Sequence, residues 1–587
     1  MLDTWFNEEL SSAFMRPSPT WEVAFIDEAN IKVLCRELGL PPLLAHLLVR
    51  RGVKDPEEAF RHLNPRLAHF ASPFLLPDME KAVRRLEQAV KQREKIAIYG
   101  DYDADGTTGA AVLYLFLREL GLEPVVIFPH RERDGYGFHP QYLSVLKEQG
   151  VKLIVTVDCG ITAHEACRLA RELGLEVIIT DHHEVPPELP PALAVVNPKR
   201  PDSAYPYREL AGVGVAFSLV RALRQRLYEK GFFAREVPNL KRYLDLVALG
   251  TIADIVPLTG ENRLAAYFGL QELSETKRPG LCALKEVAGL KGPVGTTEVI
   301  YRLAPRINAA GRMKEARLAF ELLVTDDPSR AQELAAELHR LNGERQRLEE
   351  QILRAALRQI EERLSPERWA YVLAGEDWPL GVIGIVASRL QEFLYRPVIL
   401  LSQGEELLRG SGRSIPEVNL YRCLESCREH LLAFGGHPAA AGLKLSPENL
   451  DDFVRAFEES VAQELAGKPP VPKLTLDAWV RVKHLLDPRF IEGYLRLGPF
   501  GPGYPEPLFA LRGFEIRRPT IVKERHFKFF LWQEGASLEA ICFCFGQEMP
   551  QKVAALAGSL DLTEFQGRQY LQLRVRDLKL SSLPDEK

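Results

Sequence analysis

The chain has 587 residues, of which 46% are hydrophobic and 26% are charged. At roughly 100–200 residues per domain this length predicts about three or four domains, and the near-average composition excludes a mostly disordered, collagenous or coiled-coil protein. The 75 Lys and Arg residues against 80 Asp and Glu residues give a net charge of −5, which excludes a uniformly basic nucleic-acid coat but allows local basic patches.

The chain carries no sequence signal for a membrane or for secretion. No stretch approaches the roughly 18 consecutive apolar residues of a membrane helix. The start, MLDTWFNEELSSAF, lacks the basic and apolar regions of a secretory signal. The eight cysteines are scattered without a CxxC pair, which predicts reduced thiols rather than a disulfide framework or a zinc site. We therefore predict a cytoplasmic protein.

A parallel α/β sheet is predicted for residues 76–325, after an N-terminal segment of residues 1–75. Short apolar runs begin at Ile96, Val125, Leu153, Val177 and Leu193. An amphipathic helix is predicted at 78–94, before the first run, and apolar residues at three- and four-residue spacing predict helices between the runs at 107–120, 142–149 and 163–173. Strands that alternate with helices favour a parallel sheet with right-handed crossovers.

Three further units are predicted downstream of this sheet. Residues 326–366 have charged faces and leucines at helical spacing, which is typical of a connector helix. Residues 367–466 repeat an α/β pattern in a smaller domain. Residues 467–587 begin with the linker KPPVPK and contain five β-like runs, which predict a small barrel or sandwich.

Acidic residues lie at the ends of three of the predicted strands. The first strand is followed by Asp101, Asp103 and Asp105, the third by Asp158, and the fourth by Asp181-His182-His183-Glu184. Because parallel strands place their carboxyl ends along one edge of a sheet, these side chains should converge on one crevice. Packed carboxylates repel one another unless cations neutralise them, and oxygen ligands with imidazoles suit Mn²⁺ or Mg²⁺.

Each of these motifs has a structural alternative. An Asp-Gly pair at a strand end is usually turn chemistry, and a His pair alone is more often a surface feature or a helix cap. The same acid-rich ending on three strands of one sheet is difficult to obtain from turns alone, so we favour a site for two metal ions. The glycines of GVG at Gly212 lack the third glycine of a dinucleotide-binding motif, and we assign them no ligand.

The motifs DYDADG, VDCG and TDHHE, followed by GTIADIVPL at Gly250, resemble the motifs of the DHH phosphoesterase family. WPLGVIGIVASRL at Trp378 and GGHPAAAG at Gly435 resemble the DHHA1 domain that accompanies it. With the β-rich C-terminal unit, interpreted as an oligonucleotide-binding (OB-like) barrel, the arrangement is similar to that of the family's single-strand-specific 5′→3′ exonucleases. The expected fold is thus a parallel-sheet DHH domain, a long helix, a smaller α/β DHHA1 domain and a β-barrel.

The resemblance implies roles for individual residues. Asp105, Asp158, His182 and Asp254 match the ligands of one metal ion, and Asp103 with a bridging Asp158 matches those of the second. His183 is implied as a general acid or as a group that stabilises phosphate charge, with Asp158 also in the catalytic set. Asp101 is either a carboxylate that orients a ligand or a turn acid. Tyr99 stands where related phosphatases have a metal-binding His, so we expect weaker binding of the second ion.

Candidate substrate contacts lie in both α/β domains. Arg131 follows the second strand, while Arg413, Ser414 and the loop Gly435-Gly436-His437 are implied by the resemblance as a site for the terminal phosphate. Arg306, Asn308 and Arg312 are either substrate contacts or members of a structural ion-pair network.

In the C-terminal unit, basic residues interleave with aromatic ones in a pattern that suits single-stranded DNA. The candidates are Arg517, Arg518, Lys523, Arg525, Lys528 and Trp532. Alternatively, the strand places Phe527 and Phe529 in a core and its cations in solvent.

The sequence therefore predicts an Mn²⁺- or Mg²⁺-dependent exonuclease that degrades single-stranded DNA 5′→3′ to mononucleotides in repair and recombination. The resemblance also implies a single-strand-binding protein and a helicase as partners. One alternative is a phosphatase of short oligonucleotides, cyclic dinucleotides or polyphosphate. A non-catalytic single-strand-binding scaffold is disfavoured because the acids and histidines of the metal site are all present.

Overall fold

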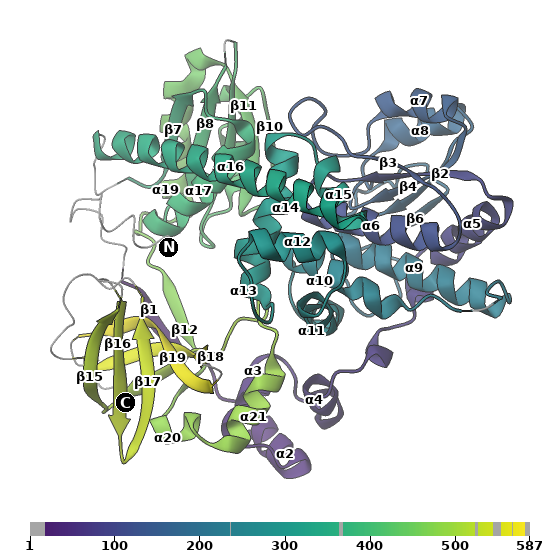
Figure 1. Ribbon diagram of the computed structural model, residues 1–587. Helices are drawn as coiled ribbons and strands as arrows, with labels where there is room; N and C mark the ends of the chain where they lie inside the picture. Colours follow the sequence, from purple (N-terminus) through teal and green to yellow (C-terminus); the bar gives the residue numbers. More distant parts are fainter. Residues whose placement is uncertain are drawn as a thin grey trace.

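The computed structural model describes residues 18–234, 236–362, 368–404, 406–522, 526–543, 553–565 and 568–580. Figure 1 shows a blue-to-teal α/β domain, a green α/β domain and a yellow β-rich domain, with the purple N-terminal helices beside the yellow one. No helix in these ranges is long and apolar enough to cross a membrane.

The first α/β domain is built on a parallel sheet with the strand order β3-β2-β4-β5-β6. Its strands are β2 (Lys95–Gly100), β3 (Val125–Ile127), β4 (Val151–Val157), β5 (Glu176–Thr180) and β6 (Ala194–Val196). The chain leaves β2 toward β3 on one side and returns to β4 on the other. The carboxyl ends of β2 and β4 therefore flank a topological switch point, where open α/β sheets bind ligands.

Helices cover both faces of this sheet because its buried strands alternate between two cores. One core contains Ile98 and Val155, and the opposite one contains Tyr99 and Ile154. The first face is covered mainly by α5 (Met79–Gln92), α6 (Ala104–Glu119) and α9 (Gly212–Glu229), and the second by α7 (Leu143–Glu148) and α8 (His164–Glu172).

A helical layer then leads from the sheet to the second domain. It comprises α10 (Leu244–Ala253), α11 (Gly260–Ser274), α12 (Pro279–Val287), α13 (Thr296–Glu298), a π-helical turn (Val299–Leu303), α14 (Ala304–Met313) and α15 (Arg317–Val324). The connector α16 (Pro328–Glu362) follows as one continuous helix of 35 residues. Its first half packs in the core of the first domain and its second half in a separate core with α17 (Leu380–Leu394), as Figure 1 shows.

The second α/β domain has a mixed sheet with the order β10-β11-β9-β8-β7. Only β7 and β8 run parallel among these neighbours, and the other pairs are antiparallel in the described chain. The strands are β7 (Tyr371–Glu376), β8 (Val398–Gln403), β9 (Leu408–Arg413), β10 (Ala433–Gly436) and β11 (Ala440–Leu445), and the remaining helices are α18 (Leu420–Ser426) and α19 (Leu450–Glu464).

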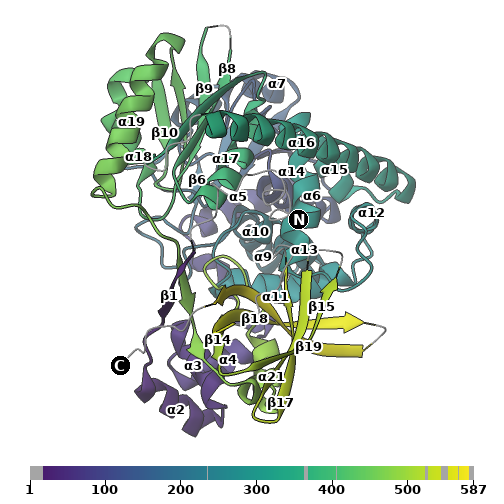
Figure 2. The same cartoon turned by 90° about the vertical axis from the view of Figure 1, so that its left-hand side faces the viewer.

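The C-terminal domain is a curled mixed sheet with the order β13-β14-β18-β19-β17-β16-β15 within the described residues (Figures 1 and 2). The strands are β13 (Ala478–Trp479), β14 (Phe509–Arg512), β15 (Glu515–Val522), β16 (His526–Gln533), β17 (Ala536–Cys542), β18 (Ala555–Phe565) and β19 (Arg568–Lys579). The helices α20 (Val482–Leu485) and α21 (Pro488–Leu497) lie between β13 and β14. One of the five predicted β-like runs, FALRGFEIRR at residues 509–518, is divided at Gly513 between β14 and β15. None of the five runs covered β18.

The N-terminal segment packs against the C-terminal domain, although the two lie at opposite ends of the sequence. Strand β1 (Thr20–Val23) pairs in parallel with β12 (Lys473–Leu476). Leu44 and Leu48 share a core with Phe509 and Phe529. The helices of this segment are α2 (Glu28–Leu38), α3 (Pro42–Arg50) and α4 (Pro56–Leu63), and Figure 2 shows them beside α21 and β14.

Candidate active site

The acids that follow β2 are fixed by the start of α6. Asp103 is the N-cap residue, and its Oδ1 accepts hydrogen bonds from the backbone N–H of Asp105 at 2.9 Å and of Gly106 at 3.0 Å. The amide oxygen of Asn308 accepts the N–H of Ala104 at 2.8 Å. Helix α14 therefore holds the first turn of α6, and with it the direction in which its acids point.

Asp105 is held by the N-terminus of α9. Its Oδ2 accepts the N–H of Gly212 at 2.6 Å and its Oδ1 that of Val213 at 2.8 Å. A side chain on Gly212 would place its Cβ only 2.6 Å from Cβ of Asp158. The glycine to which sequence analysis assigned no ligand thus brings a helix N-terminus against two of the acids, where its partial positive charge favours carboxylates.

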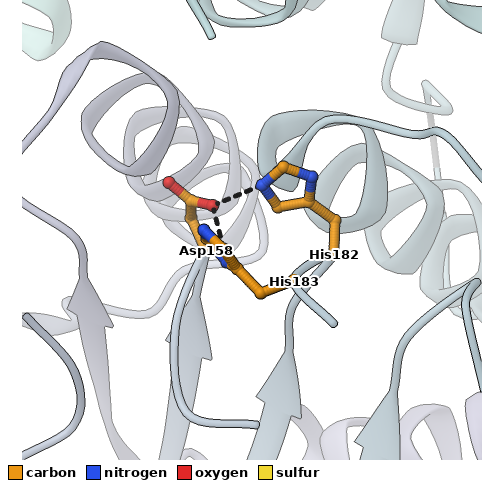
Figure 3. A group of neighbouring side chains, drawn as sticks. All are labelled: Asp158, His182 and His183. Atoms are coloured by element: carbon orange, nitrogen blue, oxygen red, sulfur yellow. Dashed lines mark ion pairs between the residues drawn. The ribbon is translucent and has the colours of Figure 1, made fainter. Parts of the chain in front are cut away.

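Asp158 is at the end of β4 in a left-handed backbone conformation, with φ of 63°. Its N–H donates to the carbonyl of Thr180 at 3.0 Å, and the side chain is almost fully buried. Oδ1 lies 3.1 Å from Nε2 of His182 and 3.9 Å from Nδ1 of His183, as Figure 3 shows. This one carboxylate therefore faces both histidines that follow β5.

Asp181 orients those two histidines, a role that the sequence analysis did not assign. Its Oδ1 accepts the N–H of His182 at 2.7 Å and Nδ1 of His183 at 2.8 Å, and its Oδ2 accepts the N–H of Ile161 at 2.9 Å. Burial alone would raise the pKa of Asp181, but the hydrogen bond and charge of His183 lower it. Asp181 is thus a buried carboxylate that accepts several hydrogen bonds, fixes the ring of His183 through Nδ1 and holds the backbone of His182.

Asp254 completes the group from the end of α10. It is the C-cap residue, and its Oδ2 lies 3.6 Å from Nε2 of His182. Nε2 of His182 is also 3.9 Å from Oδ2 of Asp105. His182 therefore stands among three carboxylates that come from three different parts of the chain.

The donor atoms of these side chains form overlapping sets in which all atoms lie within 4.8 Å of one another. The sets are Asp105, His182 and Asp254; Asp101, Asp103 and Asp158; and Asp158, His182 and His183. The first two sets contain the acids that the resemblance divides between two metal ions. Asp101, which sequence analysis left open, supplies an oxygen to the second set.

The atoms aimed into these sets are not satisfied by hydrogen bonds within the described chain. Among the described residues nothing forms a hydrogen bond with Oδ1 of Asp101, Oδ1 of Asp158, Nε2 of His182 or Oδ2 of Asp254, although these side-chain atoms are buried. Buried polar atoms are normally satisfied, and carboxylate oxygens with one imidazole nitrogen are the donors that Mn²⁺ and Mg²⁺ accept. The residues therefore fit a divalent-metal site.

Electrostatics supports the same conclusion. Burial, followed by repulsion from neighbouring carboxylates, raises the pKa of Asp105 and of Asp158 well above the ordinary aspartate value. Burial and the charge of Asp103 raise the pKa of Asp254 to about 7, while burial lowers that of His182 to about 3. Bound cations would restore the charged carboxylates and keep the imidazole neutral, as metal coordination requires.

A polar cavity of about 360 Å³ opens onto these acids. It is lined by Asp101, Tyr102, Asp103, Arg131, Tyr136, His183, Ala253, Asp254, Asn308 and Arg312. The Arg131 guanidinium lies 5.0 Å from the centre of the Tyr102 ring. Burial and the neighbouring charge of Arg131 lower the pKa of Arg312 to about 10. Cations therefore face carboxylates across a space that suits a phosphate.

Tyr136 is a second residue that sequence analysis missed. Its hydroxyl is 3.0 Å from Nδ1 of His183 and 3.4 Å from the carbonyl of Asp158. Tyr99, by contrast, is fully buried in the core under α7 and α8, and its hydroxyl donates to the carbonyl of Gly137. The aromatic hydroxyl near the acids is thus that of Tyr136, in the segment between β3 and α7.

Burial of the His183 ring would by itself lower its pKa. The hydrogen bond and the negative charge of Asp181 act in the opposite direction and raise the pKa of His183 above the ordinary histidine value. Because Asp181 occupies Nδ1, Nε2 is the ring nitrogen that remains for a ligand.

Other candidates lie on the second α/β domain. Arg413 is at the end of β9, and its guanidinium donates to Oγ of Ser411 and to the carbonyl of Gly412. The Arg131 charge contributes, after burial, to a lowered pKa of Arg413, so the two cations face each other across the domain boundary. Ser414 is buried, and its hydroxyl donates to the carbonyl of Val418.

The glycine loop and Arg306 occupy different positions relative to the cavity. Gly435 and Gly436 end β10, and the N–H of His437 donates to the carbonyl of Ala440 in the turn to β11. The His437 charge contributes to a lowered pKa of Glu184, after the hydrogen bond and charge of Lys199, so this turn faces the first domain. Arg306 does not line the cavity, because its guanidinium donates to the Arg302 carbonyl and contacts Nδ1 of His339.

In the C-terminal domain, strand β16 alternates between a buried and an accessible face. Phe527, Phe529 and Leu531 are buried, whereas Lys528 and Trp532 lie on the other face. The Arg517 guanidinium stacks 4.2 Å from the centre of the Trp532 ring, and Lys528 pairs with Glu539 at 2.9 Å. Arg518 is exposed beside a bulge in β15. Lys523 and Arg525 lie outside the described residues.

Family models match most of the chain. The DHH family N-terminal domain matches residues 95–251, the DHHA1 domain matches residues 367–463 and the RecJ OB domain matches residues 476–577. These are the three units that the sheets define in the structure.

Relatives and solved structures match over nearly the full length. The single-stranded-DNA-specific exonuclease RecJ of Bacillus subtilis is 39% identical over 96% of this chain and 71% of its own length, and that of Escherichia coli is 37% identical over 92% of this chain and 96% of its own. The crystal structure of RecJ in complex with Mn²⁺ from Thermus thermophilus covers 97% of this chain and 81% of its own, with 34% identity and a TM-score of 0.81. Its Mg²⁺ complex gives a TM-score of 0.75 at 33% identity, over 96% of this chain and 79% of its own.

Proposed function

The chain belongs to the RecJ family, and from that premise we propose that it hydrolyses single-stranded DNA from the 5′ end to mononucleotides. The observation that carries the proposal is that buried carboxylate oxygens and a histidine nitrogen converge on one cavity lined by arginines, although they have no hydrogen-bond partner among the described residues. Acids of this kind bind divalent cations, and arginines bind phosphates. The combination is that of a metal-dependent phosphodiesterase.

Two metal ions are held by the two sets of acids. Asp105, His182 and Asp254 would hold one ion, Asp101 and Asp103 would hold the other, and Asp158 would contribute to both. When bound, such a pair activates water and stabilises the attacking and leaving oxygens of an in-line displacement at phosphorus. Asp181 and Gly212 support this site by holding His182 and Asp105 in place.

Cations and His183 act on the phosphate itself. Arg131 and Arg312 line the cavity beside the acids, and Arg413 faces Arg131 from the second domain. Their fixed charges attract the phosphate of the terminal nucleotide and stabilise the negative charge that develops on its oxygens. Nε2 of His183 donates a hydrogen bond to the same group.

The remaining candidates bind the strand at a distance from the chemistry. The turn at Gly435-Gly436-His437 binds the 5′ terminus from the second domain, with Ser414 supporting β9 behind it. On the C-terminal domain, Arg517, Arg518 and Lys528 follow the backbone while Trp532 offers a ring to a base. Lys523 and Arg525 extend the same basic segment in sequence.

The cellular setting is part of the same proposal. Relatives that carry the name single-stranded-DNA-specific exonuclease support single-stranded DNA as the substrate. We propose that the chain acts in repair and recombination, with a helicase and a single-strand-binding protein supplying and covering the strand. Six of the described cysteines are free thiols, which suits a reducing cytoplasm: Cys35, Cys159, Cys167, Cys282, Cys423 and Cys427.

The test is Mn²⁺-dependent digestion of end-labelled DNA. Single-stranded, blunt duplex and 3′-blocked substrates are compared, with Asp158→Asn as the inactive control. We expect the single strand to shorten to mononucleotides despite the 3′ block, and the duplex to persist. Cleavage of dinucleotides or polyphosphate alone would instead favour a small-molecule phosphatase, and persistence of the 3′-blocked strand would reverse the polarity.

A further inference from the structure

The segment between α21 and β14 leaves the C-terminal domain and enters the core of the first domain. Tyr504 is 2% exposed and belongs to the first domain's core, and Phe500 packs against both cores. The carbonyl of Pro502 accepts the N–H of Leu258 at 2.7 Å. Non-covalent contacts of residues 496–504 thus attach the C-terminal domain to the first domain, in addition to the covalent connection along the chain.

Arg263, on the first turn of α11, holds this segment. Its Nε donates to the carbonyl of Leu497 at 3.1 Å, and its Nη2 lies 2.8 Å from the carbonyl of Gly498 and 2.9 Å from that of Arg496. Its Nη1 donates to the carbonyl of His62, at the end of α4, at 3.1 Å. One guanidinium therefore binds the first domain, the N-terminal segment and the segment that leads into the C-terminal domain.

The surroundings of Arg263 make this contact rigid. The side chain is 4% exposed, and no carboxylate pairs with it in the described part of the chain. The Tyr504 ring lies 5.7 Å from its guanidinium carbon, and the Tyr504 hydroxyl lies 2.7 Å from Nε2 of His62. A planar group with five donors matches several carbonyls at once, which a lysine ammonium cannot do from a single point.

The same segment packs against the loop that carries a metal-site acid. Pro257 and Leu258 follow Asp254 by only a few residues. Gly503 has φ of 66°, and a Cβ built there would lie 2.7 Å from Cβ of Pro257. The contact therefore places the segment that leads into the C-terminal domain against the loop that follows Asp254, a residue that lines the catalytic cavity.

We propose that Arg263 is a positioning residue that keeps the C-terminal DNA-binding domain in register with the catalytic cavity, so that a strand bound on that domain delivers its 5′ end to the acids. The inference rests on the proposed function, since it concerns the same substrate. Displacements of about 1 Å far from the reacting atoms can reduce rates substantially, because they misplace an otherwise bound substrate. A short strand that never reaches the C-terminal domain does not depend on this register.

The experiment measures KM and kcat over a series of 5′-phosphorylated single strands of increasing length. For the wild type we expect KM to fall as strands become long enough to contact the C-terminal domain. For Arg263→Met we expect that gain to shrink by about tenfold, the equivalent of losing roughly one base-stacking contact, with kcat on the shortest strands unchanged. Arg263→Lys should lie between the two.

Arg221→Met is the matched control. Arg221 also stacks on an aromatic ring, that of Phe70, and donates to the carbonyl of Ala71, but it does not contact residues 496–504. It should retain the full dependence of KM on length. Gly503→Ala disrupts the same contact from the opposite side and should give the result expected for Arg263→Met. It takes the place of Arg263→Met if that variant does not fold.

The positioning role and the proposed function are overturned by different outcomes. A uniform loss at all lengths in Arg263→Met and Gly503→Ala, or a wild type whose KM does not change with length, overturns the positioning role while leaving the exonuclease intact. A wild type that digests no single strand overturns the proposed function itself.

Discussion

Two clusters of buried charged residues in this molecule differ in how their charges are paired. In the catalytic cluster Asp105, Asp158 and Asp254 face one another and His182, and burial with mutual repulsion raises the pKa of each acid. In the interface between α16 and α17, both oxygens of the buried Glu349 are taken by arginines, Oε2 by Arg345 and Oε1 by Arg389, each at 2.8 Å.

The difference shows which cluster serves function and which serves the fold. In the Glu349 cluster the chain itself supplies cations to the buried acid, so the carboxylate costs little as long as both partners are present. The catalytic acids cannot neutralise one another, and Oδ1 of Asp158 and Oδ2 of Asp254 have no hydrogen-bond partner in the described residues. Without bound cations, the repulsion among these acids destabilises the folded state. Because cations relieve that repulsion, the cluster is suited to bind them.

The largest expected effect is the loss of activity in Asp158→Asn. Removing the charge of the carboxylate that we propose both metal ions share should lower kcat by about a thousandfold, because metal-based charge stabilisation is worth several kcal/mol. Asparagine tolerates the left-handed backbone of this position. In the presence of a chelator the variant should be at least as stable as the wild type, since it removes repulsion. Urea unfolding measures this, and a clear loss of stability would show that Asp158 serves the fold.

The second prediction is the opposite behaviour at Glu349. Glu349→Gln leaves Arg345 and Arg389 buried without a carboxylate, so we expect the free energy of unfolding to fall by about 3–4 kcal/mol. Its neighbour Glu350 forms an exposed pair with Arg354 on the same helix, and Glu350→Gln should cost less than about 1 kcal/mol. Equal losses in the two variants would remove the distinction between the clusters.

The third prediction concerns metal removal. At an Mn²⁺ concentration about a hundred times the dissociation constant, the wild type should gain about 2.7 kcal/mol of stability over the chelated protein. Glu349→Gln should keep this increment in full, while Asp158→Asn should lose most of it. Differential scanning calorimetry with and without Mn²⁺ measures the gain, and an increment that survives in Asp158→Asn would place the bound ions elsewhere.

Sequence analysis located the acids because strand periodicity predicts where each strand ends. Asp103, Asp105 and Asp158 follow directly from that pattern, and the sheet brings them together. The resemblance, rather than periodicity, singled out Asp254, since it ends a helix far along the chain. The parallel sheet, the long connector and a β-rich C-terminal domain were likewise predictable from local patterns.

What the sequence did not reveal depends on contacts between distant segments. The N–H groups of Gly212 and Val213 bind Asp105 across more than a hundred residues, and no local pattern of GVG indicates it. The packing of the N-terminal helices on the C-terminal domain and the carbonyls around Arg263 are equally non-local. A buried arginine that binds carbonyls looks, in sequence, like any surface arginine of an amphipathic helix.

The smallest expected effect is at Asp181, which shares features with both clusters. It is a fully buried acid like the catalytic ones, yet its oxygens are satisfied by backbone N–H groups and by His183. Asp181→Asn should therefore weaken Mn²⁺ binding by about ten- to a hundredfold, the usual cost of losing a group that orients a metal ligand, without abolishing the site.

Isothermal titration with Mn²⁺ measures that weakening directly, and saturating Mn²⁺ should restore most of the activity. Rescue by metal separates an orienting role from a purely structural one, because a destabilised fold would lose activity at every Mn²⁺ concentration. Failure of rescue with unchanged stability would instead indicate that Asp181 acts through His183 on the phosphate, since His183 is the one ring that it binds through a side-chain nitrogen in the described structure. Asp181 would then support the phosphate-binding cavity rather than the metal ligands.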